Sequence, residues 1–519
     1  MDFAKERQQY IPPVPELLRD LSRVCVKESP FESKDLDIQE LLPKTAATPM
    51  CTIYDGPPVK RAPLKVGVCF SGGQAPGGHN VIAGLFDALV EGSTLIGFEN
   101  GPIGVIEGHT RLLTKEIIDP FRNQGGFDLI GSGRDKIDSD EKLAKAHATI
   151  EKLGLDGLVI IGGDDSNTNA ALLAEYLLEM GSACSVIGVP KTIDGDLRGE
   201  FVEISFGFDT ATRTYSEMIG NICRDALSAK KYTHFIKLMG RSASHIALEC
   251  AHNTHPNLTL IGEEIAEKQE SLADVTTKIA DLIEKRAEAG KNYGVILIPE
   301  GVIEFIPEVR ALIKELNHAL GQGKDLSKLT AKSKQTLDSF PDKIKEQLLM
   351  ERDPHGNVQV SKISLEELLI LSVKEALKFR PSFKGKFNPQ PHFMGYEGRA
   401  AYPTNFDSNY CAALGRVAAL LIMEGKTSLM ASVGPLTKPP KEWIPRGLPL
   451  PQIMTFEERG GVSKGVIKKS LVDLEGKHFQ SFAKERDKWA VEDHYIYPGP
   501  IQYFGNKLIT DLIPNIIKK

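Results

Sequence analysis

The sequence predicts an α/β protein with mostly parallel sheets and helices on both faces of each sheet. Two short apolar runs, Leu158–Ile161 and Ser185–Val189, are typical of strands that are buried on both sides. A loop with acidic residues follows each run, and stretches with apolar residues at helical spacing alternate with such runs along the chain. Because consecutive parallel strands need a crossover between them, this alternation favours doubly wound parallel sheets.

The first strand–helix unit follows a polar start. Residues 1–60 are broken by prolines, and we expect them to form an N-terminal extension that packs on the body. Lys65–Phe70 is apolar and predicts a strand, and the glycine-rich segment Ser71–Asn80 predicts a loop. The residues after this loop predict a helix because their apolar side chains share one helical face: Val81, Ile82, Leu85, Phe86 and Leu89.

The next unit has the same order of elements. A strand is expected at Gly157–Ile161, followed by the acidic loop Gly162–Asp165 and by a helix that Gly181 ends. The strand at Ser185–Val189 follows, and Pro190 terminates it. Both acidic segments are therefore expected at the carboxyl ends of neighbouring strands.

The later elements follow the same pattern with one interruption. We expect a helix after Asp209, strands at Thr233–Leu238, Asn257–Ile261 and Tyr293–Ile298, and helices at Leu272–Ala289 and Tyr410–Met423. Residues 307–387 are rich in Lys, Glu, Leu and Ser and predict a helical insertion. The stretch from Thr437 onward is rich in proline and gives no clear pattern.

Composition limits the possible classes of function. The 519 residues, of which 41% are hydrophobic and 25% charged, leave room for two or more domains. A net charge of −6 argues against nucleic acid as a partner. Seven scattered cysteines without a CxxC pair argue against a disulfide framework and a zinc site. No segment looks like a signal peptide or approaches the roughly 20 apolar residues of a membrane span, so we expect a cytoplasmic protein without a membrane partner.

Acidic residues and one lysine are expected at a single sheet edge. Asp164 and Asp165 follow one predicted strand, and Lys191, Asp194 and Asp196 follow the next. So much negative charge needs a metal ion or cationic groups to offset it, and aspartates with a lysine are the groups that phosphoryl transfer through Mg²⁺ uses. The pattern therefore indicates a phosphotransferase.

The loop Ser71–Asn80 is a candidate phosphate cradle. Its glycines allow backbone N–H groups to approach a phosphate at the start of a helix. It matches neither GxxxxGK[ST] nor GxGxxG, which excludes an ordinary P-loop and argues against a dinucleotide site. Taken alone, the loop is equally compatible with a purely structural turn.

Four motifs taken together resemble the phosphofructokinase family: Ser71–Asn80, Gly162–Asn169, Pro190–Leu197 and Met239–Arg241. The likeness is greatest to its long pyrophosphate-dependent members, including the catalytic β subunits of plants, and covers Leu64 to Arg416. It implies reversible transfer of phosphate from pyrophosphate to the 1-hydroxyl of fructose 6-phosphate in glycolysis, with Mg²⁺. The products would be fructose 1,6-bisphosphate and phosphate.

The resemblance also implies two Rossmann-like domains with an active-site cleft between them. The pyrophosphate domain would span residues 61–205 with a returning segment near 400–440. The fructose 6-phosphate domain would span 206–306 and 388–400, with 307–387 as the helical insertion and 441–519 as a C-terminal extension.

Roles for the acidic segments are implied by the same resemblance. Asp194 would take the proton of the sugar hydroxyl, and Lys191 would stabilise the transferred group. Asp164 would hold Mg²⁺, and Asp196 would support the metal or hold the loop. The Asp165 carboxylate would occupy the place of the α-phosphate of ATP and exclude the nucleotide.

Binding residues are implied as two further groups. Pyrophosphate would contact Gly72, Gly73, Arg134 and Lys191. Fructose 6-phosphate would contact Thr192, Asp194, Lys231, Tyr232, Met239, Gly240, Arg241, Glu300, Tyr396 and Arg399. In relatives the Lys231–Tyr232 pair reaches a neighbouring subunit's sugar site, so a homodimer or a larger oligomer is expected.

Several alternatives stay open at this point. An ATP-dependent 6-phosphofructokinase would use the same base, and a non-catalytic subunit would only sense a sugar phosphate. At single positions, Asp194 can cap a turn, Lys191 can be a surface lysine and Met239 can be part of the core.

Overall fold

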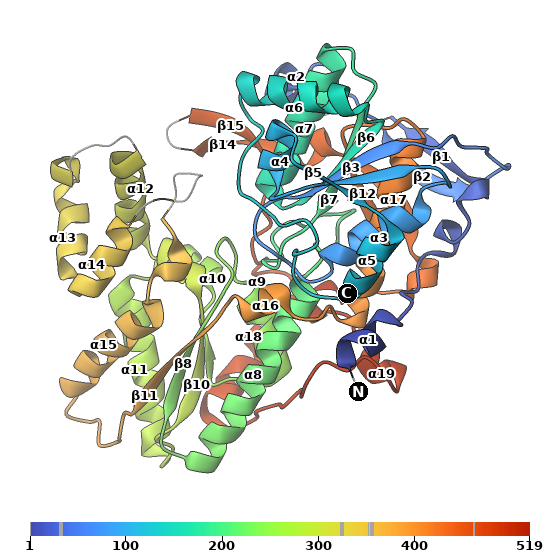
Figure 1. Ribbon diagram of the computed structural model, residues 1–519. Coiled ribbons are helices and arrows are strands. Elements are labelled where there is room, and N and C mark those ends of the chain that lie inside the picture. Colours follow the sequence, from blue (N-terminus) through green and yellow to red (C-terminus); the bar gives the residue numbers. More distant parts are fainter. Residues whose placement is uncertain are drawn as a thin grey trace. The chain divides into compact units, whose positions relative to one another are not determined.

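The computed structural model describes residues 2–30, 35–321, 326–350, 352, 358–459 and 462–518. The chain divides into two compact units, each with its own sheet (Figure 1). Unit 1 consists of Met1–Ala211, Arg399–Ser470 and Gln502–Ile513. Unit 2 consists of Thr212–Gly398, Leu471–Ile501 and Pro514–Lys519. The α/β class expected from the alternating pattern is confirmed.

Unit 1 contains a mixed sheet with a parallel centre. Within the described residues its strand order is β1-β2-β13-β12-β7-β6-β3-β4-β5. The strands β12, β7, β6, β3 and β4 are parallel, and the strands on either side of them are antiparallel. Their bounds are β1 Val24–Ser29, β2 Met50–Asp55, β3 Lys65–Phe70, β4 Thr94–Phe98, β5 Thr110–Leu113, β6 Gly157–Gly162, β7 Ser185–Pro190, β12 Leu429–Gly434 and β13 Ile444–Pro449.

The helices of unit 1 cover both faces of this sheet. Leu158 and Ile160 of β6 share an apolar core with α6 (Asp140–Leu153) and α7 (Asp164–Glu179). Successive side chains of a strand point to opposite faces, so Val159 and Ile161 face the other side. There α3 (Gly78–Ala88) packs against α17 (Asn405–Met423) (Figure 1). The central strands β6 and β7 are thus buried on both faces, as their unbroken apolar sequences indicate.

The strand register aligns the carboxyl ends of three strands. Phe70 of β3 pairs with Ile161 of β6, and Gly162 of β6 pairs with Pro190 of β7. Every residue of β6 and β7 is buried. The loops that follow β3, β6 and β7 therefore leave the sheet at the same edge, where α/β proteins bind ligands.

Unit 2 contains a smaller sheet in which neighbouring strands are parallel. Its order within the described residues is β11-β8-β10-β9, with β8 at Thr233–Leu238, β9 at Leu258–Thr259, β10 at Gly294–Pro299 and β11 at Pro389–Met394. The strand expected at Asn257–Ile261 is therefore much shorter than predicted. The Asn257 side chain accepts the Val295 N–H at 2.9 Å, and α10 (Gly262–Glu267) begins directly after Ile261.

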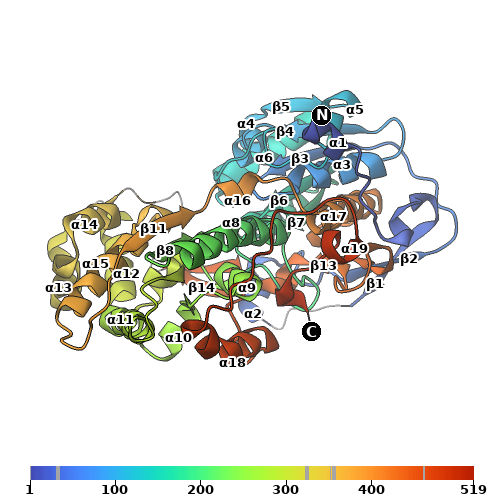
Figure 2. The ribbon, with the colours of Figure 1, turned by 90° about the horizontal axis from the view of Figure 1, so that it is seen from below.

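Helices make up most of the rest of unit 2. Most of α8 (Phe208–Ala229) belongs to this unit, together with α9 (His245–Thr254) and α11 (Leu272–Glu288). The C-terminal helix α18 (Lys477–Val491) lies beside α11, as Figure 2 shows from below. The Asn257 side chain ties this helix to the sheet by donating to the Trp489 carbonyl at 2.9 Å.

The described part of the segment 307–387 is mostly helical. It carries α12 (Pro307–Gly321), α13 (Ala331–Ser339), α14 (Asp342–Leu349) and α15 (Leu365–Lys378). Their apolar faces share one core with α11 and β10. A buried lysine in the sheet also reaches this segment, because Lys237 donates to the Ile363 carbonyl at 2.7 Å and lies 3.3 Å from the Glu366 carboxylate.

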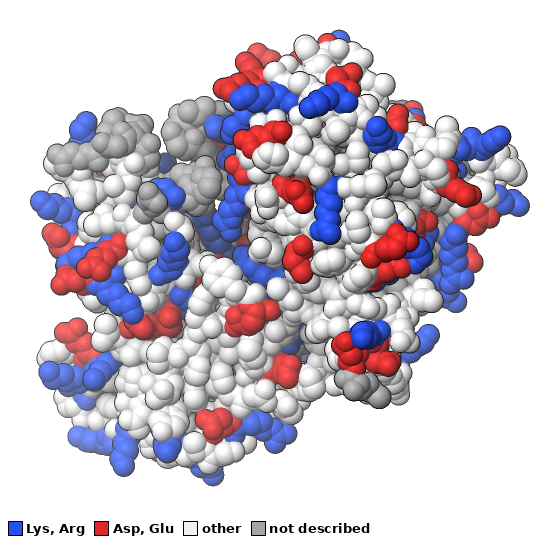
Figure 3. Space-filling model, in the orientation of Figure 1, with Lys and Arg blue, Asp and Glu red and all other residues white. Residues whose placement is uncertain are grey.

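The structure shows surface charges of both signs (Figure 3) and cysteines that form no disulfides. Basic and acidic side chains are interspersed on the face that Figure 3 shows. The seven cysteines are all free thiols, and only Cys25 is partly exposed. None of the helices in the described ranges combines the length and the apolar character that a membrane crossing requires.

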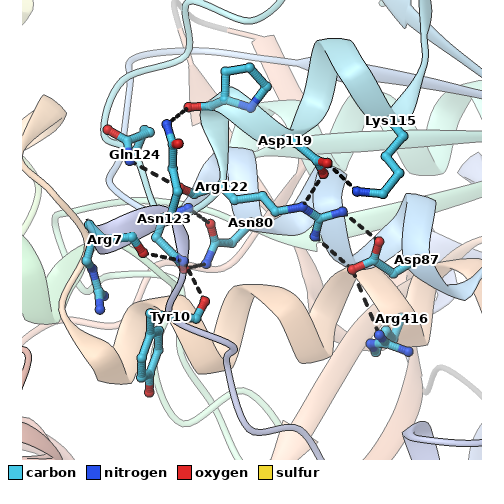
Figure 4. A network of polar contacts seen from close by, with 12 residues as sticks. Arg7, Tyr10, Asn80, Asp87, Lys115, Asp119, Arg122, Asn123, Gln124 and Arg416 are labelled. Atoms are coloured by element: carbon cyan, nitrogen blue, oxygen red, sulfur yellow. Dashed lines mark hydrogen bonds and ion pairs between the residues drawn. The ribbon is translucent and has the colours of Figure 1, made fainter. Parts of the chain in front are cut away.

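A buried arginine fixes the N-terminal extension to unit 1. Arg7 of α1 (Phe3–Gln8) is fully buried and donates to Asn405 Oδ1 at 2.8 Å, to the Pro403 carbonyl at 2.8 Å and to Ser408 Oγ at 2.9 Å. Figure 4 shows Asn123 beside it, with its amide donating to the Arg7 and Tyr10 carbonyls. Burial lowers the Arg7 pKa to about 10. The extension is therefore held by hydrogen bonds to α17 and to Pro403, which lies just before this helix.

Replacing this arginine should destabilise unit 1. Arg7→Ala removes three charge-assisted hydrogen bonds and leaves their acceptors buried, which should lower the free energy of unfolding by about 3 kcal/mol. We expect the melting temperature of the variant to fall by roughly 5–10 °C in differential scanning calorimetry. Lys5→Ala, on the exposed face of the same helix, is the control. Equal melting temperatures for the two variants would contradict this role.

Candidate active site

Three loops meet at the carboxyl edge of the unit 1 sheet. The Ser71 N–H donates to the Ile161 carbonyl at 2.8 Å, and the Lys191 N–H donates to the Gly162 carbonyl at 2.9 Å. Ser166 Oγ donates to Ser71 Oγ at 2.8 Å. These bonds tie the loops after β3, β6 and β7 to one another, so the side chains they carry have fixed positions.

Glycines leave room for cationic side chains in the first loop. Gly72 has a φ of +86°, and a Cβ atom there would lie 3.1 Å from Lys191 Nζ. A Cβ atom at Gly73 would lie 2.8 Å from Arg399 Nη1 and 3.8 Å from Arg134 Nη2. The backbone of this loop therefore lies in direct reach of three cations, which is the arrangement of an anion cradle.

Lys191 is the most buried of these cations. Its side chain is 5% exposed, and Nζ donates to the Gly73 carbonyl at 2.7 Å. The Lys191 pKa is lowered to about 7, mainly by burial and also by the charges of Arg399 and Arg134, while the carboxylates of Asp194 and Asp164 act in the opposite direction. Arg399 itself donates to the Gln74 carbonyl at 3.4 Å. A bound anion would relieve the repulsion among these three groups.

Carboxylates gather beside the cations. Asp164 and Asp165 are the first two residues of α7, and Asp164 Oδ2 lies 3.3 Å from Lys469 Nζ. Asp196 is buried and lies 4.0 Å from the same Nζ. The Asp196 pKa is raised to about 7, mainly by burial and also by the charges of Asp194 and Asp164, while Lys469 acts in the opposite direction. The three aspartates therefore act on one another through their charges.

Asp194 sits in a turn that its own loop stabilises. Its N–H donates to Thr192 Oγ1 at 3.1 Å, and the Thr192 carbonyl accepts from Ser205 Oγ at 2.8 Å. Asp194 Oδ1 is buried and has no hydrogen-bond partner among the described residues. An unsatisfied buried carboxylate oxygen is costly, so a hydroxyl donor at this point would be bound favourably.

The carboxylates near Asp164 suit a magnesium ion that keeps several water ligands better than a metal ion bound by protein side chains alone. Across the described ranges, no three His, Cys, Asp or Glu side chains are grouped as a complete metal site. Mg²⁺ commonly keeps several waters and is held by one or two carboxylates together with substrate phosphates. Asp164, beside Asp196 and close to the cationic cradle, suits this mode of binding.

A second group of the predicted residues lies in unit 2. Met239, Gly240 and Arg241 follow β8, and Glu300 follows the neighbouring strand β10. Glu300 is buried and its Oε1 accepts the Gly240 N–H at 3.2 Å. Arg241 lies 3.4 Å from the Glu304 carboxylate. This sheet edge thus presents a guanidinium and a carboxylate, the groups that bind a phosphate and a hydroxyl.

Five predicted sugar-binding residues are not part of this group: Lys231 and Tyr232 at the other end of β8, and Thr192, Asp194 and Arg399 in unit 1. Lys231 and Tyr232 precede the first residue of β8, whereas Met239 follows its last residue, so about 20 Å of strand separates them within one chain. Lys231 Nζ lies 4.9 Å from the centre of the Tyr232 ring. Tyr396 follows β11, which pairs with β8, so it lies at the same sheet edge as Met239, and it is 63% exposed. Arg399, also expected at the sugar, lies in unit 1 at the donor loop.

Lys469 was not among the residues predicted from the sequence. This residue directly follows β15 (Val462–Ile467), in a region whose sequence gave no clear pattern. The only sequence signal is a pair of lysines, Lys468 and Lys469, and such pairs are most often solvent-exposed. Only the folded chain brings Lys469 to Asp164.

The sequence matches one family model and is similar to named relatives of that family. Residues 65–351 match the family model described as phosphofructokinase. The chain is 49% identical over 98% of its length to the pyrophosphate–fructose 6-phosphate 1-phosphotransferase of Treponema pallidum, of which it covers 95%. It is 55% identical over 85% of its length to subunit beta 2 of the enzyme of the same name from Arabidopsis thaliana, of which it covers 80%.

Solved structures share the fold. The pyrophosphate-dependent phosphofructokinase of Nitrosospira multiformis has a TM-score of 0.56 and 17% identity, with 88% of this chain and 96% of that chain covered. The one from Marinobacter aquaeolei has a TM-score of 0.54 and 16% identity, with 82% of this chain and 91% of that chain covered.

The buried Lys191 should make stability depend on pH. A lysine whose pKa falls to about 7 on folding binds fewer protons in the folded than in the unfolded state between pH 7 and its ordinary value, so its cost is largest at low pH. We expect Lys191→Met to raise the melting temperature more at pH 6 than at pH 9. Lys152→Met, an exposed position on α6, is the control. A gain that is the same at both pH values would contradict the buried charge.

Proposed function

The chain belongs to the phosphofructokinase family, and we propose that it transfers phosphate from pyrophosphate to the 1-hydroxyl of fructose 6-phosphate. The products are fructose 1,6-bisphosphate and phosphate, and the reaction is a reversible step of glycolysis. The observation that carries this proposal is the buried Lys191 beneath the glycine loop, with Arg134 and Arg399 beside it. Relatives that the chain matches over 98% and 85% of its length carry this activity in their names.

Pyrophosphate would bind in the cradle of unit 1. Its charge is concentrated on a few oxygens, which suits a compact site with backbone N–H groups and three cations. Gly72 and Gly73 allow this close approach, and Lys191, Arg134 and Arg399 supply the positive charge. Lys191 would then stabilise the phosphoryl group as it transfers, because its position is fixed before the donor arrives.

Selection against ATP would come from Asp165. This carboxylate is the second residue of α7, next to Asp164, and the N-terminus of a helix otherwise favours phosphate. An aspartate in that place repels a further phosphate group and fills part of its volume. Lys191 balances the added negative charge of Asp165. The two residues together would therefore favour pyrophosphate over ATP as the phosphoryl donor.

Asp194 would act as the base. Phosphoryl transfer has a loose transition state, so the base need only orient the hydroxyl and accept its proton late. The buried Asp194 Oδ1 offers an acceptor for that hydroxyl. Thr192 shapes the turn and would add a contact to the sugar. Asp164 would hold Mg²⁺, which when bound neutralises charge on the pyrophosphate oxygens.

The sugar phosphate would be held by residues of unit 2. Arg241 would bind its phosphate, with Glu300 and Gly240 positioned for its hydroxyls and Met239 and Tyr396 beside the ring. Lys231 and Tyr232 lie at the other end of β8, so we propose that they serve the site of a neighbouring subunit in a homodimer or larger oligomer. The reaction would take place in the cytoplasm.

The two alternatives are less well supported. A non-catalytic subunit does not need the base, the metal carboxylate and the buried cation together, yet Asp194, Asp164 and Lys191 are all present. An ATP-dependent enzyme does not need Asp165 beside Asp164. A coupled assay with fructose 6-phosphate should give turnover with pyrophosphate and little with ATP. Equal turnover with both donors would defeat the proposed donor site.

Loss of the base should abolish turnover with little effect on binding. We expect Asp194→Ser to lower kcat by about 10²- to 10⁴-fold, because the proton acceptor acts in the transition state. The KM values for both substrates should change little. Asp338→Ser, an exposed aspartate of α13, serves as the control. A variant at position 194 that keeps most of its activity would refute this assignment.

Substitutions at Asp165 can separate charge from volume. Asp165→Asn removes the charge and keeps the size, whereas Asp165→Gly removes both. We expect ATP to become a measurable donor in both variants and a better one in Asp165→Gly, although Lys191 will limit the gain. Initial rates with ATP measure this effect. If neither variant accepts ATP, another barrier excludes the nucleotide.

A further inference from the structure

Lys469 is held in place by its neighbours along the chain. The Lys468 N–H donates to the Ile453 carbonyl at 3.0 Å, and the Ser470 N–H donates to the Asp196 carbonyl at 2.7 Å. Just before them, the Ile467 N–H donates to Thr168 Oγ1 on α7 at 3.1 Å. The segment after the hairpin of β14 (Met454–Arg459) and β15 is thus bonded to α7 and to the loop that carries the base.

The Lys469 side chain bridges two carboxylates of the proposed donor site. Its Nζ lies 3.3 Å from Asp164 Oδ2 and 4.0 Å from Asp196 Oδ2, and the side chain is 30% exposed. The two carboxylates are more buried, at 20% for Asp164 and 7% for Asp196. A lysine in this position offsets negative charge that would otherwise repel an incoming anion.

The same lysine competes with a metal ion for Asp164. A carboxylate oxygen that coordinates Mg²⁺ has less charge left for an ammonium group, and two cations so close together repel each other. A lysine side chain is flexible and has three donors, so it can move to another acceptor without moving its backbone. Among acceptors near Asp164, the oxygens of a metal-bound pyrophosphate would carry the most negative charge.

We propose that Lys469 is a further pyrophosphate-binding residue, which pairs with Asp164 and Asp196 while the donor is absent and turns to the donor oxygens when pyrophosphate binds. This inference rests on the proposed function and adds a fourth cation to the donor site. It also gives the β14–β15 hairpin a role, because the hairpin places this cation. A lysine that only stabilised the packing of the C-terminal segment would instead stay paired with the two carboxylates whether or not pyrophosphate is bound.

Two binding measurements separate these roles. In Lys469→Met we expect the Kd for pyrophosphate with Mg²⁺, measured by calorimetry, to rise by about tenfold or more, the value of one charge-assisted contact. The Kd for Mn²⁺ alone, measured by electron paramagnetic resonance, should fall several-fold because a competing cation has gone. The Kd for fructose 6-phosphate should stay within about twofold of the wild-type value.

Matched variants control for folding and for charge. Lys468→Met removes an exposed lysine one residue away and should change none of these constants. Lys469→Gln keeps a hydrogen-bond donor for the two carboxylates without the charge, so it tests the proposal even if Lys469→Met folds poorly. Lys469→Arg should restore part of the pyrophosphate affinity. Far-ultraviolet circular dichroism and melting temperatures verify that each variant is folded.

The outcomes also separate this inference from the proposed function. Pyrophosphate affinity within twofold of wild type in both Lys469→Met and Lys469→Gln would overturn the inference alone. Mn²⁺ affinity that stays the same or falls would overturn it too, since the inference requires Lys469 to compete with the metal ion for Asp164. If the wild-type enzyme neither binds nor uses pyrophosphate, the proposed function fails and the inference fails with it.

Discussion

The burial of one charged lysine under a glycine loop is the constraint on which the proposed donor site depends. Lys191 is held by the Gly73 carbonyl and by the register of β6 and β7, in a place where its own burial and two arginines disfavour its charge. Such an arrangement costs stability, because burial disfavours the charge of Lys191 even with the carboxylates of Asp194 and Asp164 nearby. The arrangement makes physical sense when a strongly charged anion completes it. The neighbouring aspartates then set where a metal ion and a sugar hydroxyl can join that anion.

Much of unit 1 could be predicted from local patterns, for a clear physical reason. The strands β3, β6 and β7 are buried on both faces, so their sequences are continuous apolar runs, and the loops after them carry the chemistry that marks a sheet edge. The outer strands β1, β2 and β13 left no such signal. They are antiparallel and only partly buried, and they come from segments far apart in the sequence. The length of β9 was overestimated because the Asn257 side chain, rather than a backbone carbonyl, accepts the Val295 N–H, and because α10 begins directly after Ile261.

In the candidate site, too, the residues in local motifs could be predicted from the sequence, whereas those that arrive through long-range packing could not. Motifs place Lys191, Asp164 and Asp194 in neighbouring loops, because parallel strands end at a common edge. Lys469 reaches that edge through the packing of a distant hairpin on α7, and no spacing in the sequence encodes this contact. Likewise, Arg399 follows the Tyr-Glu-Gly motif of unit 2 and yet lies at the Gly73 loop of unit 1. Tertiary contacts of this kind are visible only in the folded chain.

A crystal structure with Mg²⁺ and methylenediphosphonate, an unreactive analogue of pyrophosphate, would test the central claim most directly. The account predicts that one phosphonate group lies within hydrogen-bond distance of Lys191 Nζ and of backbone N–H groups in the glycine loop, with the metal ion beside Asp164. An analogue bound elsewhere, with Lys191 still donating to the Gly73 carbonyl, would contradict it.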